Sequence, residues 1–192
     1  MYRRVRFDPA MGSEIADAYR QAPVTDERAF PAYAAFRRET IRQFHLLVGR
    51  RELGGLGLTV RIVDDDPYPD ATAMIADIRD RRLRVLASAA SGNPHPYLSD
   101  WENDMFRAVH DAFGHAASGR GFDPHGEEAA WLKHAAMYSP LARRALTTET
   151  RGQICALVLG RPGGGFPPQK AALLSRRFSD PRSVRIDETH RG

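Results

Sequence analysis

Histidines are concentrated in one part of this sequence, where carboxylates lie between them. Four of the seven histidines, His110, His115, His125 and His134, fall within 25 residues. Imidazole binds Fe, Zn, Cu and Ni, and carboxylates add negative charge and oxygen donors. The composition of this stretch therefore predicts a protein site for a divalent metal.

His110 and His115 are the central pair of the predicted site. On a straight helix, positions five apart point about 140° away from each other. Gly114 directly precedes His115, and a glycine there allows the helix to end or unwind. We therefore expect a two-ligand corner that depends on a helix break at Gly114. Asp111, four residues before His115, is placed to orient its imidazole.

The next predicted helix offers further candidates. Glu127, Trp131 and His134 follow one another at i, i+4 and i+7, so they share one helical face. Glu128 is rotated away from that face, and we expect Glu127 to be the inward carboxylate.

A second carboxylate lies in the run Thr147-Thr-Glu-Thr-Arg-Gly-Gln153. Around Glu149 this run supplies hydroxyl, guanidinium and amide donors. Arg151 could hold a substrate carboxylate or anchor Glu149.

Two resemblances accompany these motifs. The run His110-Asp-Ala-Phe-Gly-His115 resembles the HELLGH segment of the pterin-dependent aromatic amino acid hydroxylases, and Thr147-Thr-Glu-Thr150 is similar to their T-V-E-F-G run. That resemblance, over about 45 residues, implies Fe(II) held by His110, His115 and Glu149. The chain is shorter than that family's catalytic domain and shows no pterin pocket, so we expect neither pterin nor an aromatic amino acid substrate.

The stretch from about residue 60 to 175 also resembles uncharacterised bacterial and phage-associated proteins with VHDxFGH, GExxAW…H and TETRGQ runs. This resemblance implies no established activity. It implies a shared site made of His110, Asp111, His115, Glu127, His134, Glu149, Arg151 and Gln153.

Our leading functional prediction is a metal-dependent enzyme, a non-haem Fe(II) oxygenase or hydroxylase that acts on a small organic substrate with O2. One or two ions are expected, the second held by Glu127 and His134. The expected metal ligands are His110, His115, Glu149 and His134; the expected catalytic residues are Glu127, Arg151 and Asp111; and the expected substrate contacts are Trp131, Tyr138 and Gln153.

Two alternatives stay open. The first is a Zn(II)-dependent hydrolase with Glu127 or Glu149 as general base, although the H-E-x-x-H peptidase signature is absent. The second is a phage-type structural or DNA-associated module in which a metal only braces the fold.

The surrounding pattern predicts a mainly α fold with a small β element (α+β), a single domain over residues 1–192. We divide it into an N-terminal helical part (1–55), a small β/α part (56–90), the metal-site helices (98–178) and a loose tail (180–192). Strands are expected at 58–63 and 83–86. Helices are expected at 12–21, 27–48, 70–80, 99–114, 124–138, 139–159 and 168–176, with Asp70 and Ser139 among the N-caps.

Composition adds limits on the class of protein. The net charge is +4, but the arginine pairs are scattered rather than gathered in a stripe, so nucleic acid is not an expected partner. The lone Cys155 suits a reducing compartment. No apolar run approaches the ~20 residues of a membrane helix. The N-terminus lacks the apolar core of a secretory signal. We therefore expect a cytoplasmic protein without a membrane segment.

Overall fold

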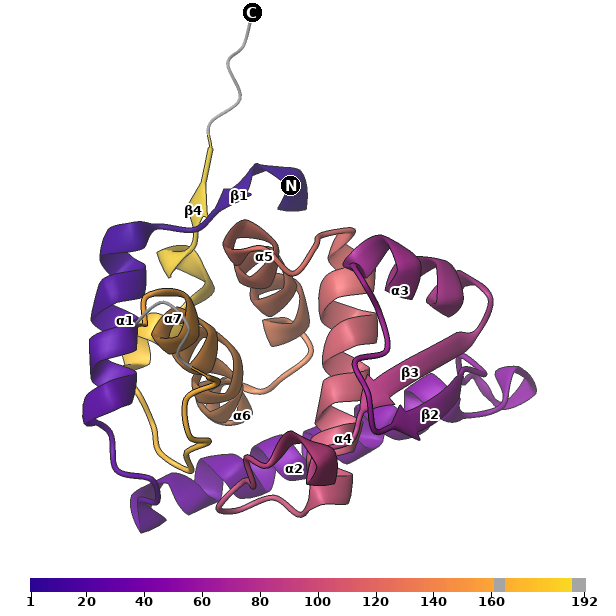
Figure 1. Cartoon of the computed structure of the whole chain (residues 1–192), viewed down its shortest axis with the longest axis horizontal. Helices are drawn as coiled ribbons and strands as arrows, with labels where there is room; N and C mark the ends of the chain where they lie inside the picture. The colour runs from indigo at the N-terminus through magenta and orange to yellow at the C-terminus, as the bar shows by residue number, and fades with distance from the viewer. Residues whose placement is uncertain (161–164, 188–192) are drawn as a thin grey trace, which may run out of the picture.

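The computed structural model describes residues 1–160 and 165–187. The protein is mainly α-helical with small β elements, as predicted (Figure 1). Its helices are α1 (Pro9–Gln21), α2 (Phe30–Val48), α3 (Ala71–Arg79), α4 (Asp100–His110), α5 (Pro124–Ala135), α6 (Pro140–Thr147) and α7 (Gln153–Val158). None of the helices in these ranges is long and apolar enough to cross a membrane.

The long helix α2 crosses beneath the other helices, and α4 stands upright on it (Figure 1). Helix α2 packs against α4 and α6, and α1 packs against α7. The main core lies between these helices, around the fully buried side chains of Tyr33, Phe36 and Trp131. A smaller apolar cluster, which includes Ile15 and Phe178, fills the space between α1 and α7.

The two predicted strands pair with each other. Strands β2 (Thr59–Val63) and β3 (Arg82–Leu86) are parallel and in register from Thr59 opposite Arg82 to Val63 opposite Leu86. Parallel neighbours need a crossover connection, and α3 supplies it. As predicted, Asp70 caps α3 by accepting a hydrogen bond of 2.9 Å from the backbone N–H of Ala73.

The C-terminal segment differs from the prediction. Residues 168–175 form no helix; instead the backbone of Ala171 pairs with Val24 and Asp26 in an isolated bridge, where its small side chain is fully buried. Part of the expected loose tail is also ordered: β4 (Arg185–Ile186) pairs antiparallel with β1 (Val5–Arg6). The rest of that tail, from residue 188, lies outside the described residues.

The helix that carries the histidine pair does not end at Gly114. It begins at a capping box, in which Ser99 and Glu102 bond each other's backbone N–H groups. Beyond His110 it continues as a π-helical segment, Asp111–Ala116. A second π-helical segment, Thr148–Gly152, joins α6 to α7. Such segments are rare in proteins and are frequent at functional sites.

Candidate metal site

His110 and His115 converge because the helix widens between them. In the π-helical segment, the N–H of Ala117 bonds the carbonyl of Ala112, five residues earlier. The extra residue per turn brings the side chain of His115 to the side of His110. Their ring centroids lie 5.1 Å apart and their planes are nearly perpendicular, at 86°. The convergence that we predicted is present, but a π-turn produces it rather than a helix end.

Gly114 has a packing role at this point. A Cβ on Gly114 would lie 3.2 Å from the carbonyl oxygen of Ala130 and 3.2 Å from His110 Nδ1. Glycine therefore lets α5 approach the π-helical segment closely, and α5 carries the third member of the site.

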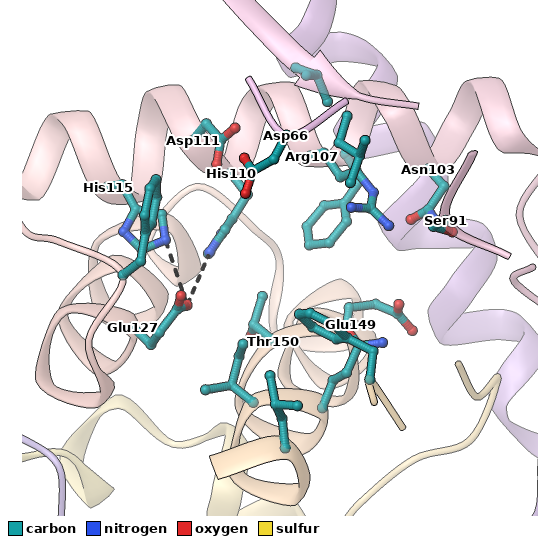
Figure 2. Close-up of a pocket in the computed structure, with 18 of the residues that line it drawn as sticks. Asp66, Ser91, Asn103, Arg107, His110, Asp111, His115, Glu127, Glu149 and Thr150 are labelled. Atoms are coloured by element: carbon teal, nitrogen blue, oxygen red, sulfur yellow. Dashed lines mark ion pairs between the residues drawn. The ribbon is translucent and has the colours of Figure 1, made fainter. Parts of the chain in front are cut away.

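Glu127 completes a triad with the two histidines. Its Oε2 lies 3.6 Å from His115 Nε2 and 4.0 Å from His110 Nε2 (Figure 2). Both separations are longer than a hydrogen bond. Both are shorter than the ~4.2 Å that separates two ligands on opposite sides of an ion with bonds of ~2.1 Å. Among the described residues, this is the group of His, Cys, Asp and Glu side chains that could hold a metal ion.

The local structure of α5 directs Glu127 into this position. Asp123 caps the helix by accepting hydrogen bonds from the N–H groups of His125 and Gly126, and Pro124 takes the first helical position. Glu127 thus lies in the first turn, where the helix dipole favours a carboxylate. Although burial alone would raise it, the two facing imidazoles lower the pKa of Glu127 to about 2.

A chain of hydrogen bonds orients the His110 ring. Gln43 Oε1, on α2, lies 2.8 Å from His134 Nε2, and His134 Nδ1 lies 3.2 Å from His110 Nδ1. The amide oxygen only accepts, so His134 Nε2 carries the proton and, because burial lowers the pKa of His134 well below its usual value, Nδ1 is an acceptor. His110 Nδ1 therefore donates, which leaves the lone pair of His110 Nε2 directed at the triad.

The His115 ring has a similar arrangement. Its Nδ1 lies 3.4 Å from the carbonyl oxygen of Arg120, a contact that keeps the proton on Nδ1 and the lone pair on Nε2. Burial opposes the charged form, but the Glu127 carboxylate raises the pKa of His115. When both rings are neutral, as a metal requires, all three ligand atoms of the triad direct a lone pair into the space between them.

The triad opens onto a cavity of about 530 Å³, a size that suits a small-molecule ligand. His110, His115 and Glu127 lie at one end, and the carboxylate of Glu149 lies on the opposite side (Figure 2). Most of the remaining wall is apolar: Pro67, Tyr68, Met74, Val85, Leu86, Phe106, Phe122, Ile154, Leu157 and Phe166. Asp111 also lines the cavity, and burial raises the pKa of its carboxyl to about 7.

Glu149, our expected third ligand, belongs to a different cluster. Its Oε1 lies 2.5 Å from the hydroxyl of Tyr33 and 3.1 Å from His95 Nε2. His95 Nδ1 accepts hydrogen bonds from the N–H groups of Tyr97 and Leu98, so Nε2 carries the proton and donates to the carboxylate. The π-helical segment 148–152 directs Glu149 into this network, and Glu127 takes the place at the metal site.

The other candidate residues are distributed between the cavity and the core. His134 lies behind His110, and both of its ring nitrogens are occupied, so it is not placed as a ligand. Gln153 lines the cavity. Trp131 and Tyr138 are buried in the core, where they bond Thr147 and Thr40 respectively.

Arg151 contacts other parts of the fold. Its Nε lies 2.9 Å from Glu128, its Nη1 bonds the carbonyl of Phe178, and its guanidinium covers the ring of Trp131. Glu128, which we expected to face away from the site, is thus buried in an ion pair. This pair ties α5 to the second π-helical segment and to the C-terminal segment.

Four residues that shape the site were not foreseen in the sequence: Gln43, Tyr33, His95 in its role beside Glu149, and Arg107. Arg107 carried a readable signal, since it precedes His110 by one helical turn. Gln43 and Tyr33 lie more than 60 residues away in the sequence, and no local pattern connects them with the histidine run.

Comparisons of the chain with protein-family models, with curated proteins and with solved structures find no match. The two resemblances noted in the sequence therefore stay predictions. The site that the structure does show is a His110–His115–Glu127 group that could hold a metal ion, with His115 buried and the other two partly buried, at one end of a largely apolar cavity.

Proposed function

We propose that the protein is a metal-dependent enzyme that binds one ion at His110, His115 and Glu127 and acts on a small organic molecule in the adjoining cavity. One observation carries the proposal. Three ligand atoms converge from one side, within 4.8 Å of one another, and the cavity lies next to them. A metal that only braced the fold would be enclosed by four protein ligands.

Iron(II) is our proposed metal. Two imidazoles and one carboxylate on one face of an ion are typical of non-haem iron oxygenases. Such an ion would supply O2 activation, which leads to oxidation of the organic substrate. The residues of the chain have separate tasks: His134 and Gln43 fix the His110 ring, and the apolar wall excludes water from the substrate.

A Zn(II)-dependent hydrolase is the second candidate. The same donor set, two histidines and a glutamate, also holds catalytic zinc. Asp111 favours this alternative, because its carboxyl lines the cavity beside the triad and could accept a proton from an attacking water. The two candidates share the ligands and differ in the metal and in the need for O2.

Metal analysis of protein purified from iron-supplemented culture tests the proposal. We expect close to one iron per chain in the wild type and loss of that iron in His110→Ala and in His115→Ala. His125→Ala is the matched control, since its Nδ1 bonds the backbone of Phe7 and it is not in the triad. Co(II) absorption of the reconstituted protein then reports whether coordination positions stay open to added ligands.

Three results would contradict parts of this proposal. Zinc alone, with no O2 consumption by the reduced protein, would exclude the oxygenase and leave the hydrolase. Absence of any bound metal would exclude both. Co(II) in a closed four-ligand site that no added ligand perturbs would indicate a structural metal.

A further inference from the structure

Arg107 lies in the wall of the cavity, and its buried Nε has no hydrogen-bond partner among the described residues. It comes from α4, one turn before His110, and it is the only Lys or Arg among the described residues that line the cavity. Figure 2 shows its guanidinium directed into the space between the triad and Asn103. We infer that Arg107 is a binding residue for the carboxylate of an organic acid whose apolar body lies in the cavity beside the metal site.

The missing hydrogen bonds of Arg107 are the first argument. Its Nε is buried and has no hydrogen-bond partner in the described part of the chain. A buried donor without a partner costs free energy, and native proteins retain few of them. A ligand oxygen at this place would supply the missing acceptor.

The neighbouring carboxylate of Asp111 does not serve this purpose. Asp111 follows Arg107 by four residues, a spacing at which opposite charges can pair on a helix. Arg107 acts on Asp111 only at longer range, where its charge counteracts the rise of the Asp111 pKa, and no ion pair within 4.0 Å joins the two among the described residues. The guanidinium fork therefore remains available to a carboxylate from outside the chain, which it can hold through two parallel hydrogen bonds.

Three amide side chains of the cavity wall, those of Asn93, Asn103 and Gln169, are already hydrogen-bonded within the protein. Gln169 donates to the carbonyl of Asn93 and accepts a hydrogen bond from Asn103. Asn93 in turn donates to the carbonyl of Pro167. These amides are therefore engaged with the protein, whereas Arg107 provides the positive charge that can select an anion.

The rest of the cavity indicates what the anion is attached to. Phe106, Phe122, Ile154 and Leu157 contribute apolar wall to the same cavity, with Phe106 beside His110 and Phe122 beside His115. A free inorganic anion would leave this wall without a contact. An aryl or alkyl carboxylate would satisfy both Arg107 and the apolar wall, and its body would reach the metal ligands.

The test is direct binding without turnover. Benzoate, phenylacetate and hexanoate, each paired with its uncharged amide, are titrated into metal-free and Zn(II)-loaded protein by calorimetry. We expect at least one carboxylate to bind about tenfold more tightly than its amide, because charge-assisted hydrogen bonds are about twice as strong as neutral ones. Arg107→Gln should weaken that carboxylate at least tenfold, in whichever form of the protein binds it more tightly.

Arg144→Gln is the matched control. Arg144 is also partly buried with an unbonded Nε, but it does not line the cavity, so carboxylate binding should be unchanged. Arg107→Lys keeps the charge without the fork and should recover part of the affinity. Thermal unfolding of each variant shows whether it folds.

The inference rests on the proposed function for its substrate class, but the two can fail separately. Equal affinity for carboxylates and amides would overturn the role of Arg107 while metal binding stands. Affinity that disappears on metal removal and persists in Arg107→Gln would mean that the carboxylate binds only the metal, and it too would overturn the inference. If inorganic phosphate bound more tightly than any carboxylate, and this binding were lost in Arg107→Gln, the inferred carboxylate ligand would be wrong and Arg107 would be a phosphate-binding residue. A chain that never binds metal but still needs Arg107 for carboxylates would refute the proposed enzyme and keep this site.

Discussion

Two histidine–glutamate clusters line or adjoin the same cavity, and they differ in what their hydrogen bonds do. In the first, His110, His115 and Glu127 point their free lone pairs at one another over 3.6 and 4.0 Å. In the second, Glu149 receives hydrogen bonds from His95 and Tyr33 at 3.1 and 2.5 Å. The first cluster could hold a cation between its members, whereas the second is joined by its own protons.

The direction of the ring protons accounts for this difference. The outer nitrogens of His110 and His115 face hydrogen-bond partners outside the triad, so their protons point outward. In His95 the outer nitrogen accepts from two backbone N–H groups, so its proton points inward, at the glutamate. Residue type alone therefore does not define a metal site. The hydrogen-bond partner on the outer side of each imidazole determines whether the inner nitrogen offers a lone pair or a proton.

The largest expected effect is a loss of metal affinity when Glu127, but not Glu149, is replaced by glutamine. Glu127→Gln removes the anionic ligand, and we expect divalent-metal affinity to fall by more than about 100-fold, because loss of an outer-shell partner alone costs 10–100-fold. Glu149→Gln is the matched control and should change affinity by less than about threefold. Equilibrium dialysis with Zn(II) or Co(II) measures both; a larger loss in Glu149→Gln would reverse our assignment of the clusters.

A smaller loss is expected when the outer partner of the triad is removed. Gln43→Leu deletes the acceptor that fixes the proton of His134, so the lone pair of His110 is no longer directed at the site. We expect metal affinity to fall about 10–100-fold although Gln43 touches no metal. Tyr138→Phe is the control, since its hydroxyl bonds Thr40 at 2.7 Å beside the same histidine. Unchanged affinity in Gln43→Leu would show that the His110 ring is held by packing alone.

The comparison also shows what the sequence could reveal. The 3.6-residue period and the cap residues predicted the helices, and the inward face of α5 identified Glu127 rather than Glu128. The sequence pattern correctly placed the ring of His134 next to the histidine pair. Whether that ring binds a metal or orients His110 depends on which of its nitrogens carries the proton, and Gln43 from a distant helix determines this. Glu149 looked like a ligand because its spacing from His115 resembled a known motif.

The π-helical segments explain most of the difference between prediction and structure. A helical wheel with 100° per residue assigns wrong faces once one residue is inserted into a turn. For His110 and His115 it predicted divergence, which we removed by placing a helix break at Gly114. For Glu149, it gave no warning that the side chain faces Tyr33 on α2. Such insertions depend on tertiary packing, here on the contact between Gly114 and α5.

A third prediction concerns that contact. Gly114→Ala would place a Cβ 3.2 Å from a backbone oxygen of α5 and from His110 Nδ1, so α5 must shift. We expect a loss of about 1–3 kcal/mol in the free energy of unfolding, together with weaker metal binding as Glu127 moves from the histidines. Gly165→Ala, where a Cβ meets no atom of the described residues within 4 Å, should cost less than about 0.5 kcal/mol. Urea denaturation and metal titration of the two variants check this. Full metal affinity in Gly114→Ala would show that the close contact at Gly114 is not needed for metal binding.

The smallest effect should appear in the closed cluster, and in stability alone. Tyr33→Phe removes the hydroxyl that lies against Glu149 and bonds the carbonyl of Lys170 at 2.7 Å, and it leaves the aromatic packing against Phe36. The hydroxyl has a single proton to donate, shared between these two buried acceptors, and its loss costs about 1–2 kcal/mol in the free energy of unfolding. Metal affinity should stay within about twofold of the wild type, because the cluster already contains its own protons and shares no side chain with the triad. Chemical denaturation of the metal-free protein measures the first quantity and dialysis the second. If metal affinity fell as much as in Gln43→Leu, the two clusters would be coupled across the cavity, and Glu149 would have to be counted with the metal site after all.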